Sequence, residues 1–179
     1  GMIEIGDIDE AADFALALLT GWLPKGRNVA LMGGSGGSAA VFSDAADAGR
    51  LTLPPLAPAT IAVLETSLPK VGSLKNPIDY TAGYPRPETA DSFLRAISAV
   101  LSDPGIGQLA FMFASAGRNQ LKLASELLAQ ALPRIDKPVL AFSALTKEIA
   151  PEGFAKLSEI GIPMLPSPVR VAKAMTMLA

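Results

Sequence analysis

The sequence predicts an α/β domain, a three-layer α/β/α sandwich built around a parallel sheet. Apolar runs of strand length alternate with segments of helical periodicity along most of the chain, and strands that are separated by helices pair in parallel through right-handed crossovers. The run at residues 109–113 is entirely apolar, as expected for a strand that is buried on both faces. Five strands are expected, which suits the flavodoxin-like strand order.

The first segment predicts a helix that precedes the sheet. Asp7 or Asp9 can cap this helix, its apolar side chains recur at helical spacing, and it is expected to end near Gly21. We therefore interpret residues 1–24 as a leading helix and linker from the tail of a preceding domain. Residues 25–179 form the flavodoxin-like domain itself.

The remaining elements are predicted from apolar runs, proline starts and glycine stops. Strands are expected at residues 29–32, 51–56, 109–113, 137–142 and 162–165. Helices are expected at about residues 37–48, 58–68, 87–101, 120–132, 151–160 and 168–178. The strand at 51–56 is expected at a sheet edge, because Pro54 and Pro55 interrupt it. Gly49 is expected to end its helix in a left-handed conformation.

Composition excludes several classes of function. Of the 179 residues, 50% are hydrophobic and 18% charged, which allows one sizeable core. With 15 basic and 17 acidic residues and no long run of either sign, neither nucleic acid nor an anionic membrane surface is an expected partner. No apolar run approaches the ~20 residues of a membrane span. The chain has no Cys and no His, which argues against disulfides and metal sites and, with no signal sequence, favours a cytoplasmic location.

A glycine-rich turn connects the first strand to an alanine-rich helix. Glycines remove Cβ atoms where the backbone turns sharply or approaches a ligand closely, and a helix N-terminus offers unpaired N–H groups and the positive end of its dipole. This combination predicts a seat for an anion. The predicted phosphate-binding residues are Gly34, Ser35, Gly36, Gly37 and Ser38.

Three known motifs fit parts of this turn, and each lacks a required residue. The dinucleotide fingerprint needs an acid about 20 residues further on, but no Asp or Glu lies between Asp47 and Glu65. The nucleophile elbow needs a histidine base, and the P-loop needs a lysine after its glycines. The turn is therefore a simple anion seat or a tight strand-to-helix turn without a ligand.

Residues 73–80 predict a second loop of interest. Its Asn76 and Asp79 side chains are suited to bonding nearby backbone, which would support the loop. Because loops that follow parallel strands gather at the carboxyl edge of the sheet, this loop can lie beside the glycine-rich turn.

The order of these motifs resembles the NDP-forming acyl-CoA synthetases, relatives of succinyl-CoA synthetase. The likeness extends from Asn28 to Ala179 and is similar to their second flavodoxin-like ligase domain. It is carried by the segments Ser35-Gly36-Gly37, Leu53-Pro54, Leu68-Pro69, Asn76-Pro77-Ile78-Asp79, Phe111-Met112-Phe113, Lys137-Pro138-Val139, Gly161-Ile162-Pro163 and Ser167-Pro168. The leading helix resembles the tail of the domain that precedes it in the family.

The resemblance implies a chemistry for the anion seat. In such enzymes an acyl-CoA and phosphate give an acyl phosphate, whose phosphoryl group moves to a histidine and then to a nucleoside diphosphate. Two helices from two flavodoxin-like domains point their N-termini at the phosphohistidine, and the helix after Gly36 and Gly37 would be one of them. The implied partners are the CoA-binding, phosphohistidine and ATP-grasp domains of the same enzyme.

The resemblance also implies which groups lie outside this chain. CoA, ATP or ADP, and Mg²⁺ belong to the complete enzyme, and none is expected on this domain alone. Because the sequence has no histidine, the chain by itself is expected to be inactive. Arg118 falls where succinyl-CoA synthetase has an arginine near the substrate carboxylate, so it is the implied substrate-binding residue. The alternative is a solvated or paired surface arginine.

Two other functions fit the predicted fold. The domain can be a non-catalytic flavodoxin-like module that binds a phosphorylated ligand. It can also bind FMN, although one Trp and two Tyr with no aromatic pair beside a loop disfavour flavin stacking.

Overall fold

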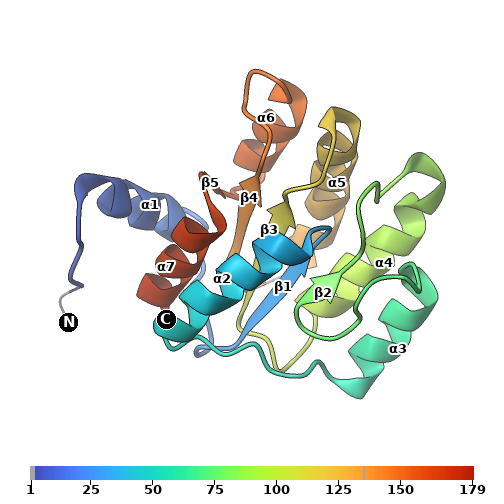
Figure 1. Cartoon of the computed structure of the whole chain (residues 1–179), viewed down its shortest axis with the longest axis horizontal. Coiled ribbons are helices and arrows are strands. Elements are labelled where there is room, and N and C mark those ends of the chain that lie inside the picture. Colours follow the sequence, from blue (N-terminus) through green and yellow to red (C-terminus); the bar gives the residue numbers. More distant parts are fainter. Residues whose placement is uncertain (1–2, 135) are drawn as a thin grey trace.

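The computed structural model describes residues 3–134 and 136–179 and consists of a five-stranded parallel sheet between two layers of helices (Figure 1). The strand order is β2-β1-β3-β4-β5, so the predicted flavodoxin-like fold is confirmed. The strands are β1 (Val29–Gly33), β2 (Ile78–Asp79), β3 (Gln108–Phe113), β4 (Val139–Ser143) and β5 (Met164–Leu165).

The helices follow the predicted order. They are α1 (Ile8–Leu18), α2 (Gly36–Ala48), α3 (Pro58–Ser67), α4 (Ala90–Leu101), α5 (Arg118–Ala131), α6 (Pro151–Glu159) and α7 (Pro168–Leu178), with short 3-10 turns η1 (Pro87–Thr89) and η2 (Leu132–Arg134). Capping residues fix several starts: Asp7 accepts a hydrogen bond from the Glu10 N–H at 2.8 Å, and Ser167 accepts one from the Arg170 N–H at 3.2 Å. Within the described ranges, no helix has the length and apolar character needed to cross a membrane.

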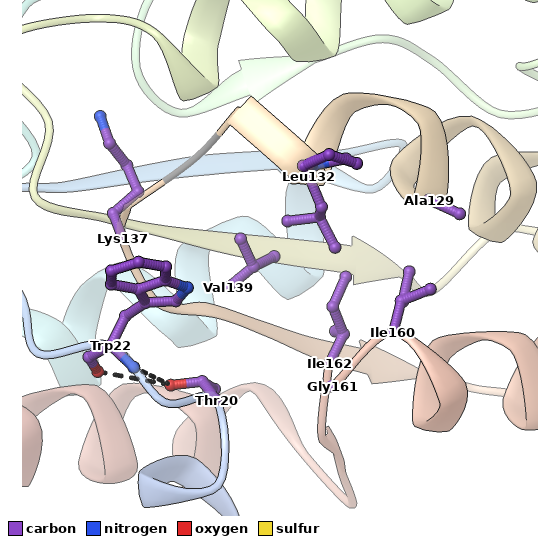
Figure 2. A pocket seen from close by; sticks show the side chains of 10 residues that line it. Thr20, Trp22, Ala129, Leu132, Lys137, Val139, Ile160, Gly161 and Ile162 are labelled. Carbon is purple, nitrogen blue, oxygen red and sulfur yellow. Dashed lines mark hydrogen bonds between the residues drawn. The ribbon is translucent and has the colours of Figure 1, made fainter.

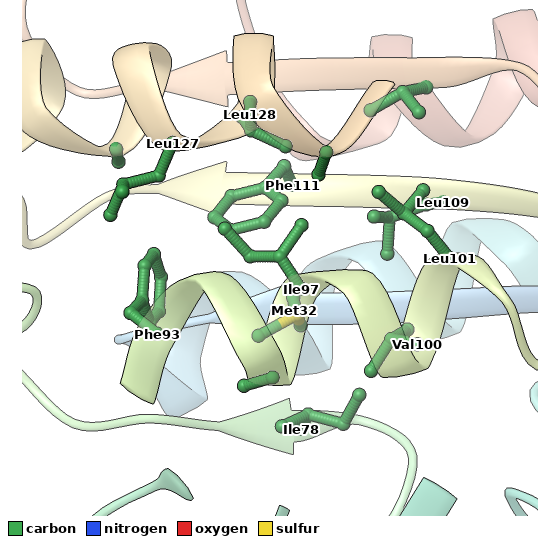
Figure 3. Packing of buried hydrophobic residues seen from close by; sticks show 14 of the residues in the cluster. Met32, Ile78, Phe93, Ile97, Val100, Leu101, Leu109, Phe111, Leu127 and Leu128 are labelled. Atoms are coloured by element: carbon green, nitrogen blue, oxygen red, sulfur yellow. The ribbon is translucent and has the colours of Figure 1, made fainter. Parts of the chain in front are cut away.

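Alternation along the strands divides the core between the two faces of the sheet. Met32 and Phe111 point toward the layer of α3 to α6, where they pack with Phe93 and Ile97 (Figure 3). The neighbouring residues on the same strands point to the other face, beneath α2 and α7. All six residues of β3 are buried, which explains the continuous apolar run at residues 109–113.

The edge strand differs from the prediction. Residues 51–56 form no strand and contribute only a single parallel bridge between Asn28 and Thr52. The two residues of β2 pair with β1 instead, although they were predicted to lie in a loop. Pro54 and Pro55 have no N–H for a sheet ladder. The Asn76 side chain bonds the Leu31 N–H and the Val29 carbonyl, so the pairing that begins at Thr52 cannot continue along β1.

The end of α2 also differs from the prediction. Gly49 has a φ of −82°, and the left-handed residue is Arg50 with a φ of 58°. Glycine is needed at position 49 for space, since a Cβ there would collide with the Thr176 side chain of α7. The close packing of α2 against α7, rather than the turn, explains this glycine.

Candidate functional site

The glycine-rich turn leads from the end of β1 into the first turn of α2. Ser35 is the N-cap residue, and its Oγ accepts a hydrogen bond from the Ser38 N–H at 3.4 Å. The Ser38 N–H, which belongs to one of the predicted phosphate-binding residues, is therefore bonded within the turn itself. The N–H groups of Gly36 and Gly37 have no hydrogen-bond partner in the described part of the chain.

Gly36 and Gly37 are exposed, and their own surroundings do not require glycine. A Cβ at either position would meet no atom within 4 Å, and neither residue has a positive φ. Glycine inside a helix costs about 1 kcal/mol relative to alanine. The first turn of α2 also carries no acidic side chain. Two unhindered N–H groups thus lie at the positive end of a helix dipole, which suits an anion that approaches the backbone closely.

Gly34 is glycine for a different reason. A Cβ there would lie 2.8 Å from the Thr81 carbonyl oxygen and 2.7 Å from Ser115 Oγ. Ser115 Oγ also donates a hydrogen bond to the Gly34 carbonyl at 2.6 Å. The loops that follow β2 and β3 therefore press against the glycine-rich turn, and three loops meet at the carboxyl edge of the sheet as expected.

The two predicted loop-support residues lie at opposite ends of this region. Asp79 pairs beside Gly33 and accepts a hydrogen bond from the Thr81 N–H at 2.8 Å, which helps to hold Thr81 in its left-handed conformation. Asn76 lies toward the amino end of β1, where its Oδ1 is 3.0 Å from the Leu31 nitrogen. Asp79 therefore shapes a loop beside the glycine-rich turn, whereas Asn76 closes the edge of the sheet.

Arg118 was predicted in a loop but is the first residue of α5. Its Nη2 lies 3.3 Å from Glu152 Oε1, and Lys122 Nζ lies 3.3 Å from the other oxygen of that carboxylate. The hydrogen bond and charge of Lys122, followed by the charge of Arg118, lower the pKa of Glu152. A ligand carboxylate at Arg118 would have to compete with Glu152 for the guanidinium.

Another arginine near this edge was not singled out from the sequence. Arg86 lies in the loop that follows β2, between Pro85 and Pro87. The pattern Pro-Arg-Pro, which fixes the backbone on both sides of a cation, is the signal that could have found it.

A cavity of about 340 Å³ lies at the other end of the sheet, near the starts of β4 and β5 (Figure 2). Thr20 and Trp22 of the linker line it together with Lys137, Val139 and the segment Ile160 to Ile162. Lys137 Nζ donates to the Asp103 and Ile106 carbonyls. The amine is therefore used within the chain.

Carboxylate clusters are not found in the part of the chain that the structure describes: no three His, Cys, Asp or Glu side chains there are placed to hold a metal ion. The groups at the carboxyl edge include backbone N–H donors and guanidinium groups, both of which favour anions.

The Ligase-CoA domain model matches residues 29–174, which covers all five strands and the helices α2 to α6. This chain belongs to the Ligase-CoA domain family. The resemblance predicted from its motifs is thereby confirmed.

Curated relatives of this Ligase-CoA domain are subunits or enzymes named as ADP-forming acetate–CoA ligases. The alpha subunits of ligases II and I from Pyrococcus furiosus are 30% and 29% identical to it over 97% and 99% of the chain. Ligase I from Archaeoglobus fulgidus is 28% identical over 99% of the chain. The domain spans 38% of each Pyrococcus subunit and 24% of the Archaeoglobus enzyme.

Solved structures share the same fold. A crystal structure of a protein from Pyrococcus horikoshii OT3 has a TM-score of 0.83 and 29% identity, and the match covers 97% of this chain and 40% of that one. A dinucleotide-forming acetyl-coenzyme A synthetase 1 from Ca. Korarchaeum cryptofilum has a TM-score of 0.82 at 22% identity, covering 99% and 38% of the two chains. The latter has been solved in its apo form and in complex with phosphate and ADP.

Proposed function

We propose that this Ligase-CoA domain is part of an NDP-forming acyl-CoA synthetase, in which the N-terminus of α2 stabilises a phosphohistidine carried on another domain. Family membership and the names of the curated relatives support the reaction class. The observation that carries the role of α2 is the exposed pair Gly36 and Gly37, whose N–H groups are unpaired among the described residues and whose Cβ positions are open.

The proposed reaction moves a phosphoryl group through three acceptors. A phosphate oxygen attacks the thioester carbonyl carbon of the acyl-CoA, and the CoA thiolate leaves. A histidine nitrogen then attacks the phosphorus of the acyl phosphate, which releases the acid, and a nucleoside diphosphate finally accepts the phosphoryl group. This sequence has no histidine, so the histidine belongs to another domain and the isolated chain is proposed to be inactive.

The part of α2 in this reaction is electrostatic. The Gly36 and Gly37 N–H groups donate to phosphoryl oxygens, and the positive end of the helix dipole offsets their charge. The Ser38 N–H joins them if the ligand displaces the Ser35 hydroxyl, whose hydrogen bond is long at 3.4 Å. Gly34, by contrast, keeps the turn close to its two neighbouring loops.

In the proposed enzyme, other domains bind the cofactors, and this domain contributes a contact to the acid substrate. CoA, the nucleotide and Mg²⁺ are held by the CoA-binding and ATP-grasp domains. Arg118 binds the carboxylate of the acid, which displaces Glu152 from the guanidinium. Residues 1–24 are the tail of a preceding domain, docked on α7 through the ion pair of Asp13 and Arg170. The enzyme is proposed to be cytoplasmic, in keeping with its cysteine-free sequence.

The role of α2 is tested by introducing a charged side chain at position 37 of the complete ligase. Gly37→Asp places a carboxylate where the phosphoryl group would sit, and Gly37→Asn adds a neutral side chain of the same shape. The rate of labelling from γ-labelled ATP should fall about 10²-fold or more in the Asp variant, and by much less in the Asn variant.

Gly36→Asp and Gly36→Asn form a second matched pair. Circular dichroism and a thermal melt should show folded protein for all four variants, because the Cβ positions are open. If both folded Asp variants are labelled at the rate of their Asn counterparts, the turn does not bind the phosphoryl group and the proposed function is wrong.

A further inference from the structure

Arg86 has a backbone that is fixed on both sides. Pro85 and Pro87 restrict the chain around it. The Arg86 N–H donates to Thr89 Oγ1 at 2.9 Å, and the same hydroxyl donates to the Arg86 carbonyl at 3.1 Å. Arg86 Nε donates to the Gly83 carbonyl at 3.1 Å, so the guanidinium is oriented as well as the backbone.

The charge of Arg86 is not neutralised within the described residues. None of their ion pairs includes Arg86, whereas Arg118 is paired with Glu152 and Arg170 with Asp13. A long exposed side chain normally keeps its rotamer freedom, and fixing it has an entropic cost. A guanidinium that is held in place without a carboxylate is therefore prepared for an anion from elsewhere.

Arg86 also lies at the edge of the sheet where the glycine-rich turn is found. Its loop begins at Thr81, whose carbonyl is the close neighbour of Gly34. Further along this loop, Gly83 lies next to both Arg86 Nη2 and Gln120 Nε2. Gln120 is in the first turn of α5, where its Oε1 accepts a hydrogen bond from the Gly117 N–H at 2.5 Å.

We propose that Arg86 binds an oxyanion of the reacting ligand, the phosphate or the carboxylate, through its two Nη atoms. Nε is used by Gly83, which leaves the outer side of the guanidinium for two parallel N–H···O bonds. The inference rests on the proposed function and adds a substrate-binding residue to it. It distinguishes Arg86 from Arg118, since only Arg118 has to give up a carboxylate partner among the described residues.

The experiment uses the complete ligase and separates the two oxyanions. The KM of inorganic phosphate is measured in the acyl-CoA-consuming direction, and the KM of acetate in the acyl-CoA-forming direction. Arg86→Ala should raise one of the two KM values about tenfold or more. In Arg86→Lys the KM should lie between those of the wild type and Arg86→Ala, because lysine keeps the positive charge but cannot donate two parallel hydrogen bonds.

Arg95→Ala is the matched control. Arg95 is an exposed arginine on α4 whose Nη2 bonds Ser92 of the same helix, and its removal should leave both KM values within twofold of wild type. Arg86→Gln serves as a second neutral variant if Arg86→Ala does not fold.

Each outcome has one meaning. A rise in the phosphate KM assigns Arg86 to the phosphate or phosphoryl group, and a rise in the acetate KM assigns it to the carboxylate. Folded neutral variants with both KM values within twofold of wild type overturn the inference. If the Gly37→Asp variant loses labelling while the Arg86 variants behave as wild type, only the Arg86 proposal fails. If Gly36→Asp and Gly37→Asp are both labelled at the rate of their Asn counterparts, the proposed function itself is wrong.

Discussion

At the amino ends of the strands, polar side chains are bonded to the backbone of the chain itself, whereas at the carboxyl ends several donors have no partner in the described residues. Before β3, the Asp103 carboxylate accepts hydrogen bonds from the Ala57 and Gly105 N–H groups, both at 2.8 Å. Before β4, Lys137 Nζ donates to the carbonyls of Asp103 and Ile106 at 3.0 and 2.7 Å. These bonds hold the connections between layers in place.

The carboxyl ends also have such bonds, at Asp79 and Ser115, but they differ in having donors without a partner among the described residues. The Gly36 and Gly37 N–H groups and the outer side of the Arg86 guanidinium remain available to a ligand. Water satisfies such exposed donors at little cost, so they add little to folding. The proposed function gives them a ligand. The comparison indicates that the amino end stabilises the domain, and the proposed function assigns ligand binding to the carboxyl end. Gln108 Oε1 is an exception, a buried oxygen at the start of β3 that has no partner among the described residues.

The largest effect on stability is expected from Asp103→Ala. This side chain is 1% exposed, and its loss leaves two N–H groups without their charged acceptor, which should lower the free energy of unfolding by about 3 kcal/mol. Urea denaturation measures this change. Asp91→Ala removes an exposed carboxylate of α4 and should cost about 0.5 kcal/mol or less. Equal effects of the two variants would contradict the structural role of the amino end.

Most of the fold could be predicted because the long elements have strong periodicity. β3 and its neighbours follow apolar runs, and helix starts follow capping residues and prolines. β2 could not be predicted from its own residues, because a two-residue strand shows no hydrophobic periodicity. In addition, the Asn76 side chain, not a backbone strand, bonds the Leu31 N–H of β1. Gly49 was misread because a sequence does not show that Thr176 lies against it.

The candidate site was predictable only in part. The strand, glycine-rich turn and helix follow from local sequence, since they are consecutive, and the anion seat at this turn stays a prediction. The pairing of Arg118 with Glu152 joins residues from two different helices, and the contact of Gly34 with Thr81 and Ser115 joins three loops. Such contacts depend on tertiary structure, so the sequence could not separate glycines that are needed for packing from glycines that leave space for a ligand.

The difference between a packing glycine and an open glycine can be tested within the glycine-rich turn itself. Gly34→Ala should lower the free energy of unfolding by about 1 to 3 kcal/mol, because its methyl group has no room beside Thr81 and Ser115. Gly36→Ala should raise it by up to about 1 kcal/mol, since alanine favours the helix and meets no neighbour. Thermal or urea unfolding of both variants measures the difference. A destabilised Gly36→Ala variant would show that position 36 is a packing glycine after all.

The smallest effect is expected from Lys137, whose amine lies at the amino end of the sheet, and it appears as a pH dependence of the free energy of unfolding. Burial of Lys137 lowers its pKa below the ordinary value of 10.5, although the charges of Asp136 and Asp103 act in the other direction. In the pH range between the lowered pKa and 10.5, the unfolded chain binds more protons than the folded chain. The free energy of unfolding should therefore rise with pH in this range as the half-buried amine loses its charge.

Lys137→Arg is the matched variant for this effect, because arginine can donate to the Asp103 and Ile106 carbonyls but stays charged throughout the range. Urea unfolding of both proteins between pH 7 and about 10.5 isolates the contribution of Lys137, since the other titrating groups cancel in the difference. The wild-type protein should gain stability relative to the variant as pH rises. A difference that stays constant would mean that water solvates the amine in the folded domain, and that the amino end is less closed than its hydrogen bonds indicate.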